Sequence, residues 1–415
     1  MALRVAVIAR SVRPLHGHGG LERSVYDLVR HLTRHNVKVT LFTAPPSART
    51  VSPDPFESPN VAIEYVPYLT FPFANRPGTT ILDRSSAYPL FGWRAGRRAL
   101  ALARRGSVDI VHAFGASGLD YALGRHKDDP PLVVNPQGLE EFGAPPLKQI
   151  GYAPLRAAVR ATTARSAVIV VTDRSLEPVV QRHLRPAPGQ TITIPNGIDL
   201  SQVSALAGSA DGQRIRRQNQ ISDDEAVLFS VGRLEYNKGF DVLARALGKS
   251  IRSGGPLTTR PWRWVLAGAG PYGPEIESVV KAEGLGKNVL FTGRIPDLDL
   301  HAWYEAATVF IHPSRYEGSS LVTLEAMAHW RAIIATRAGG LPDKVRPGVN
   351  GWLVDVDSVD GLAQAIDEAV SNWSSLPAMG KASHRIVEGE FSWTALIEHY
   401  LTLYEQLRAR NRPRT

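Results

Sequence analysis

The stretch 312–328 holds the strongest combination of residues that could do chemistry. It contains two glutamates eight positions apart, Glu317 and Glu325. An apolar, strand-like stretch ends at His312, and serines that suit a helix N-cap follow it. We expect Glu317 on a loop and Glu325 within the next helix. The first amides of that helix, at Ser320 and Leu321, would face an anion. Taken singly, the glutamates are also explained as a solvated loop residue and a surface helix residue.

A pair of cations follows another strand-like stretch. Arg233 and Lys238 stand five residues apart in a loop that also contains glycine. Arginine can donate two parallel hydrogen bonds to phosphate oxygens, and lysine supplies a compact positive charge. One such pair is commonly a pair of solvated surface residues without a ligand. The second predicted anion site, at Ser320 after another strand, strengthens the phosphate-binding interpretation.

Two glycine-rich turns suggest close backbone approach to a ligand. The first, at 16–20, ends at Gly20 before an amphipathic helix and suits an anion, although a plain turn is the favoured explanation when this motif is taken alone. The second, at 268–273, has the spacing of a dinucleotide fingerprint. Pro271 interrupts it and the next strand offers no carboxylate for a ribose, so we exclude nicotinamide binding. We still expect Gly268 to let a ligand approach the backbone.

Two pairs of aspartates have the spacing of a metal-binding motif, at 297 and 299 and at 355 and 357. We expect Asp297 to cap a helix and Asp355 to end a strand at a turn instead. The chain contains no cysteine, which excludes disulfides, thiolate metal sites and a cysteine nucleophile. The sequence therefore predicts no metal and no bound cofactor.

These residues stand among alternating strand-like and amphipathic helical stretches, which predict an α/β fold with parallel sheets covered on both faces. The predicted strands of the first half are 3–9, 37–43, 108–113, 132–135 and 167–172. Those of the second half are 226–231, 264–267, 289–292, 309–312, 333–336 and 352–354. Residues 71–90, rich in proline and aromatic side chains, are predicted to form an irregular loop.

A chain of 415 residues is too long for one ordinary core. We predict two Rossmann-like domains, at 1–190 and 191–394, joined by a hinge near a Pro-Asn-Gly turn. A terminal helix, from about 395 to 415, would return to the first domain. Such domains would face each other across a cleft where the carboxyl ends of their strands meet.

Charge is distributed unevenly along the chain. Residues 1–190 contain 24 Lys and Arg against 14 Asp and Glu, and the remainder contains 24 against 25. The first domain is therefore expected to meet an anionic partner. Arg94, Arg97, Arg98 and Arg105 fall broadly on one side of a predicted helix. Two interpretations stay open, a surface that docks on anionic lipid headgroups and a solvated helix without a partner.

No apolar run approaches the roughly 18 residues of a membrane-spanning helix, and the first ten residues lack the apolar stretch of a signal peptide. We therefore expect a cytoplasmic protein, with peripheral attachment to the inner face of a membrane left open.

Seven motifs, in the same order along essentially the whole chain, resemble those of the retaining glycosyltransferases of family four, which have the GT-B fold. They lie at 19–23, 195–199, 232–239, 268–271, 291–297, 317–325 and 339–342. The two glutamates together with Arg233 and Lys238 are the specific part. Gln137 stands where many members have histidine, and Asp343 where many have glutamate.

The resemblance implies a nucleotide-diphosphate sugar on the C-terminal domain and an acceptor on the N-terminal one. Arg233 and Lys238 would hold the diphosphate together with the amides of Ser320 and Leu321. Glu325 would accept hydrogen bonds from the ribose hydroxyls.

The same resemblance assigns further donor contacts. The backbone around Arg294 and Ile295 would meet the base, and Glu317 would bind the sugar hydroxyls. His112 would lie near the sugar from the opposite domain, and Gly20 would let the N-terminal loop close on the phosphates. The residues implied to act in catalysis are Glu317, His112, Arg233 and Lys238.

The implied reaction is metal-free hexosyl transfer with retention, from a UDP or GDP sugar. The acceptor would be a lipid-linked or polysaccharide precursor of a cell-surface glycan. Three alternatives are weighed against it: a nucleotide-sugar epimerase or hydrolase on the same scaffold, a non-catalytic nucleotide-sugar-binding protein, and a nucleic-acid-binding protein. The last has no binding motif, and the basic residues that suggest it are confined to one half of the chain.

Overall fold

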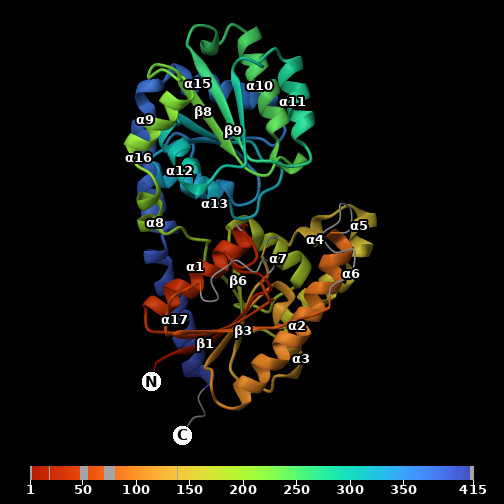
Figure 1. Cartoon of the computed structure of the whole chain (residues 1–415). Coiled ribbons are helices and arrows are strands. Elements are labelled where there is room, and N and C mark those ends of the chain that lie inside the picture. Colours follow the sequence, from red (N-terminus) through yellow and green to blue (C-terminus); the bar gives the residue numbers. More distant parts are fainter. Residues whose placement is uncertain (1, 18, 47–54, 70–79, 138, 412–415) are drawn as a thin grey trace. The chain divides into compact units, whose positions relative to one another are not determined.

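The computed structural model describes residues 2–17, 19–46, 55–69, 80–137 and 139–411 (Figure 1). The chain divides into two compact units. The first comprises Met1–Asn196 with Leu396–Thr415, and the second comprises Gly197–Ala395. The units therefore divide a few residues after the predicted boundary between 190 and 191.

The first unit contains a seven-stranded parallel sheet in the order β3-β2-β1-β4-β5-β6-β7. Its strands are β1 (Arg4–Ile8), β2 (Lys38–Thr43), β3 (Val61–Tyr65), β4 (Ile110–Phe114), β5 (Leu132–Asn135), β6 (Val168–Val171) and β7 (Thr191–Thr193). The five predicted strands are confirmed within two residues at each end. The two that were missed, β3 and β7, form the edges of the sheet, where none of their residues is fully buried.

Helices cover this sheet. They are α1 (Gly20–Arg34), α2 (Thr80–Arg104), α3 (Leu119–Gly124), α4 (Glu140–Gly143), α5 (Pro146–Gly151), α6 (Ala153–Ala164) and α7 (Glu177–Leu184). The predicted irregular loop over 71–90 is wrong from residue 80 onward, where α2 runs, and residues 71–79 lie outside the described part. Ala87, Phe91, Ala95 and Ala99 recur every four residues and are fully buried. Their packing on the sheet outweighs the cost of Pro89 inside the helix.

The second unit contains a six-stranded parallel sheet in the order β10-β9-β8-β11-β12-β13. Its strands are β8 (Ala226–Val231), β9 (Trp262–Ala267), β10 (Val289–Gly293), β11 (Val309–His312), β12 (Ala332–Thr336) and β13 (Gly351–Val354). All six predicted strands are confirmed. Along β8, Leu228 packs into one apolar cluster and Phe229 into another, because both faces of the sheet are covered.

The helices of the second unit are α8 (Leu200–Leu206), α9 (Ser209–Gln218), α10 (Phe240–Arg252), α11 (Gly273–Ala282), α12 (Asp297–Ala306), α13 (Leu321–Ala328), α14 (Leu341–Lys344), α15 (Val359–Ser371) and α16 (Leu376–Ile386). The strand β8 precedes the loop of Arg233 and Lys238, and β11 precedes the loop of Glu317. Because β8 and β11 are neighbours in the sheet, these two loops leave the same edge side by side.

The predicted terminal helix is α17 (Trp393–Asn411). It begins in the second unit, where the amide of Trp393 donates to the carbonyl of Ile198 at 3.0 Å. From Leu396 onward it belongs to the first unit, which confirms the expected return. The stripe that it buries is Leu396, Ile397, Tyr400, Leu403, Tyr404 and Leu407.

Candidate active site

Glu317 lies at the centre of a polar network at the carboxyl edge of the second sheet. Its Oε2 accepts hydrogen bonds from Lys238 Nζ at 2.7 Å, from His312 Nε2 at 2.7 Å and from Ser314 Oγ at 3.2 Å. The side chains of Glu317 and Lys238 are 12 % and 14 % exposed, and His312 is fully buried. The carboxylate is therefore held in one position by groups from two loops.

The network fixes the protonation states of Glu317 and His312. Burial raises the pKa of Glu317, but the hydrogen bond from His312 and the charge of Lys238 outweigh it and hold that pKa well below its ordinary range. Burial lowers the pKa of His312, although its bond to Glu317 opposes the shift. An ionised carboxylate only accepts hydrogen bonds, so a neutral His312 donates its Nε2 proton to Glu317.

A glycine turn brings Lys238 to Glu317. Gly239 has a φ of +67°, and a Cβ atom there would lie 2.1 Å from the carbonyl oxygen of Pro313. Only glycine allows the loop after β8 to pack this closely on the loop after β11. The amide of Arg315 also donates to the carbonyl of Asn237 at 2.8 Å, which ties the two loops together.

Arg315 braces the same loops, although sequence reasoning did not single it out. Its guanidinium bonds both oxygens of Asp241 at 2.8 Å and one oxygen of Asp357 at 2.6 Å. Burial raises the pKa of Asp241, but its bonds and proximity to Arg315 and Arg245 hold it below its ordinary range. These contacts rigidify the loops that carry Lys238 and Glu317.

Each of the two aspartate pairs with the spacing of a metal-binding motif has a member that is paired with an arginine. Asp357 pairs with Arg315, and Asp299 pairs with Arg214 at 3.3 Å. Asp297 is the first residue of α12, whose N-cap is Pro296, so the expected capping role is wrong. Within the described residues, no group of three or more histidines and carboxylates is arranged to hold a metal ion.

The start of α13 is as predicted. Ser320 is its N-cap, and the Ser320 hydroxyl accepts from the amide of Thr323 at 3.4 Å. Leu321 is the first helical residue, so its amide belongs to the turn that has no intrahelical acceptor. The positive end of the α13 dipole therefore lies a few residues after Glu317.

Glu325 is buried, with 4 % of its surface exposed, so it is not a surface helix residue. Its Oε2 accepts from the hydroxyl of Tyr304 on α12 at 2.8 Å. The Tyr304 ring in turn stacks on His329, with centroids 5.5 Å apart. Tyr304 and His329 were not predicted, because nothing in the sequence places α12 beside α13.

Arg233 lies apart from this network. Its side chain is 71 % exposed, and it pairs with Glu235 at 2.7 Å. The structure thus joins Lys238 to Glu317 but leaves Arg233 facing solvent.

The glycines at 268 and 270 have a structural use that the sequence analysis overlooked. A Cβ atom on Gly268 would lie 1.9 Å from the carbonyl oxygen of Gly232, and one on Gly270 would lie 2.3 Å from that of Leu234. These contacts explain both glycines without a ligand, and the approach of a ligand to Gly268 stays a prediction. They let this turn pack on the loop that follows β8.

The other predicted donor residues lie at ends of elements. Arg294 directly follows β10 and is exposed, whereas Ile295 packs against one of the apolar clusters. Gly20 is the exposed first residue of α1, after an N-cap at Gly19. Gln137, in the loop after β5, has a φ of +65°, and its backbone N–H donates to Asn135 Oδ1 at 3.0 Å.

His112 lies inside the first unit, on β4, with no exposed surface. Its Nδ1 shares a 2.6 Å hydrogen bond with the hydroxyl of Tyr404 on α17, and its ring stacks on Phe114. Burial lowers the pKa of His112 to about 3, so the imidazole is neutral. The ring has no exposed surface with which to touch a sugar in this structure, and the predicted place of His112 near the sugar stays a prediction.

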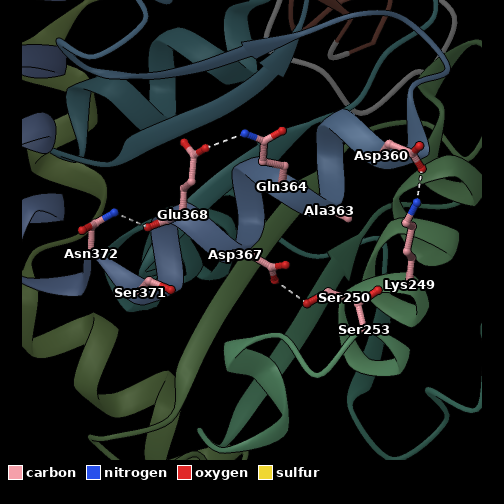
Figure 2. A pocket seen from close by; sticks show the side chains of 10 residues that line it. All are labelled: Lys249, Ser250, Ser253, Asp360, Ala363, Gln364, Asp367, Glu368, Ser371 and Asn372. Carbon is pink, nitrogen blue, oxygen red and sulfur yellow. Dashed lines mark hydrogen bonds and ion pairs between the residues drawn. The ribbon is translucent and has the colours of Figure 1, made fainter.

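A hollow of about 410 Å³ lies elsewhere on the second unit, between α10 and α15. Figure 2 shows its polar lining, in which Lys249 pairs with Asp360 and the hydroxyl of Ser250 donates to Asp367, both at 2.5 Å. None of the predicted site residues lines it. Its charged groups stabilise the contact between the two helices.

Comparisons with known proteins agree with this architecture. Residues 18–202 match the family model "Glycosyltransferase Family 4", and residues 211–386 match "Glycosyl transferases group 1". The two matches account for most of the chain. The chain is therefore a glycosyltransferase of family four with the GT-B fold.

Several proteins are similar over nearly their full length. D-inositol 3-phosphate glycosyltransferase 1 of Catenulispora acidiphila is 27 % identical, and the alignment covers 97 % of this chain and 95 % of that protein. The D-inositol 3-phosphate glycosyltransferase of Acidothermus cellulolyticus is 28 % identical, over 99 % and 91 %. An uncharacterized glycosyltransferase of Methanocaldococcus jannaschii, MJ1607, aligns over only 59 % of this chain and 61 % of its own length.

Solved structures share the fold. Sucrose-phosphate synthase from Thermosynechococcus elongatus has a TM-score of 0.78 and 25 % identity, covering 98 % of this chain and 100 % of that one. Anabaena Alr3699/HepE, solved in complex with UDP, has a TM-score of 0.71 and 20 % identity, covering 98 % and 100 %.

Proposed function

We propose that this glycosyltransferase moves a sugar from a nucleotide-diphosphate sugar to an acceptor hydroxyl, with retention and without a metal. The observation that supports it most is the buried Lys238–Glu317–His312 network beside the N-terminus of α13. Arg233, Lys238 and the first amides of α13 hold the diphosphate, and Glu317 orients the sugar hydroxyls. The similarity to a protein solved with UDP and with UDP-glucose supports a nucleotide-sugar donor.

The chemistry follows from where charge develops. The bond between the anomeric carbon and the diphosphate breaks, and a bond to the acceptor oxygen forms on the same face. The acceptor proton passes to the departing phosphate oxygen. Preorganised cations and helix amides stabilise the charge on that leaving group. Glu317 has no nucleophilic role in this proposal; three hydrogen bonds to its Oε2 hold the carboxylate in place to orient the sugar hydroxyls.

The acceptor is a glycan or lipid-linked precursor in this proposal. A phosphorylated polyol is a second candidate, favoured by relatives named for D-inositol 3-phosphate. Thermal shift with UDP-, GDP- and ADP-sugars, followed by transfer assays with the stabilising donor, tests both, since ligand stabilisation follows affinity. Donor turnover that needs no acceptor would instead indicate an epimerase or hydrolase.

Arg233→Ala is expected to lower turnover about 10²-fold, as for loss of one oxyanion-stabilising donor. Because the side chain is 71 % exposed, the melting temperature is expected to stay unchanged. Initial rates at saturating donor check this, with exposed Arg217→Ala as the matched control. Near-normal transfer by Arg233→Ala would remove the diphosphate assignment.

Transfer is expected to survive EDTA with less than about a twofold change in rate, because protein cations and amides neutralise the leaving group. Assays with excess EDTA, and with Mg²⁺ or Mn²⁺ added back, check this. An obligatory divalent cation would contradict the metal-free mechanism.

A further inference from the structure

The first unit exposes large apolar side chains on two helices that touch each other. Leu82, Leu90 and Trp93 on α2 are 64 %, 40 % and 48 % exposed. At roughly 100° per residue they share one side of the helix. On α5, Leu147 and Ile150 are 85 % and 73 % exposed.

The two helices form one surface. The hydroxyl of Ser85 on α2 donates to the carbonyl of Gly151 at the end of α5, at 2.6 Å. Both helices lie on the same flank of their unit in Figure 1. No residue of α5 is buried, so Leu147 and Ile150 are not held by the core. Large aliphatic side chains gathered in solvent mark an interaction surface.

Basic residues border these apolar residues, and the acidic side chains nearby, Asp83 and Glu140, are paired with Arg10 and Arg84. Arg97 is exposed and falls on the same side of α2 as Trp93. Arg94, next to them, is exposed and donates one N–H to the carbonyl of Pro67, which leaves its other donors to meet a ligand. Lys148, which follows Leu147 on α5, is exposed as well. Apolar residues bordered by Arg and Lys are typical of surfaces that lie in a membrane interface.

We propose that the α2–α5 surface, formed by Leu82, Leu90, Trp93, Leu147 and Ile150, docks on an anionic lipid bilayer. The five apolar side chains enter the interface, and the neighbouring arginines and lysine meet lipid phosphates. This inference rests on the proposed function, in which the acceptor can be lipid-linked. It adds the surface by which the enzyme would meet the membrane that carries that acceptor. The described residues include no helix that is both long and apolar enough to cross a membrane.

Flotation of the full chain tests the inference, with phosphatidylcholine vesicles compared against vesicles containing about one third phosphatidylglycerol. Binding is expected only with the anionic lipid and is expected to fall in 0.5 M salt. Arg94→Gln combined with Arg97→Gln is expected to weaken partitioning about 25-fold, since each cation near an anionic surface contributes about fivefold. The matched control combines Arg217→Gln and Arg385→Gln in the second unit, both exposed.

The apolar residues have their own test. Leu147→Gln with Ile150→Gln is expected to lower binding at least about tenfold. The control, Leu123→Gln with Val349→Gln, changes side chains that are 51 % exposed and lie elsewhere, and is expected to bind as the wild type does. These changes are at exposed positions, so circular dichroism is expected to show folded variants.

Several outcomes would overturn the inference. One is equal flotation of the wild type and of the variant with Leu147→Gln and Ile150→Gln. Another is release of the protein from the vesicles by millimolar inorganic phosphate. A third is a dimer of the wild type in solution that this variant abolishes. The last would assign the surface to a second copy of the chain. Donor turnover without vesicles reports on the proposed function separately, and the surface variants are expected to leave it unchanged.

Discussion

Glu317→Gln is expected to lower sugar transfer about 10³-fold and to destabilise the second unit by about 3 kcal/mol or more. The substitution removes the charge that Lys238 and His312 face, although the amide is almost the same size. Lys238 is only 14 % exposed, so it would become a cation without compensation. The lost transfer follows because the sugar-orienting carboxylate and the position of Lys238 change together.

A second variant separates the stability effect from the chemical one. Lys238→Met added to Glu317→Gln removes both charges, and the free energy of unfolding is expected to recover most of the loss. Transfer is expected to stay as low as in the single variant, because both donor contacts are absent. Urea unfolding and initial rates on the three proteins measure the two effects.

Two outcomes would contradict this account. A Glu317→Gln protein as stable as the wild type would mean that the pair is not buried in solution. Recovery of transfer in the double variant would mean that Lys238 and Glu317 hold the loops together without touching the donor.

The central strands could be predicted because burial on both faces leaves a simple pattern in the sequence. All of the residues in β8 and β11 are buried, and a strand covered on both faces reads as a short, continuous apolar run. The edge strands β3 and β7 have a solvated side and only five and three residues, so no such run marks them. Edge position alone does not hide a strand, because β10 and β13, the partly exposed edge strands of the second sheet, were predicted from their apolar residues.

Local composition misled where packing decides the structure. Pro89 and the aromatic residues around it suggested a loop, yet the helix α2 persists because its four-residue spacing of buried side chains fits the sheet. At Gly268 the opposite happened. A local motif suggested a ligand, but the close neighbour is the backbone of Gly232, which lies 36 residues away in sequence.

The candidate site was predictable one residue at a time but not as a network. Lys238 and Glu317 each follow a strand, and only the strand order, with β8 beside β11, brings them within 2.7 Å. His312 was passed over because it ends an apolar strand, although a histidine at a strand's carboxyl end is a usable signal. His112 was chosen from its motif, and the sequence could not show that α17 covers it.

The burial of the His112 imidazole predicts that the first unit loses stability in acid. Burial lowers the pKa of His112 to about 3, against an ordinary value of 6.5. Between these values the unfolded chain binds one proton more than the folded chain, so stability rises with pH and is lost on acidification. The slope is about 1.4 kcal/mol per pH unit below pH 6.5, and it is flat above.

His112→Gln is expected to remove that slope, although losing the ring will also lower stability at every pH. Urea unfolding of the first unit between pH 4.5 and 7.5 measures it, with the more exposed His126→Gln expected to keep the wild-type slope. Tyr404→Phe removes the partner but not the imidazole, so it should be less stable and equally acid-sensitive. Identical slopes for the wild type and His112→Gln would mean that water reaches this imidazole, which would restore His112 as a candidate to face the sugar.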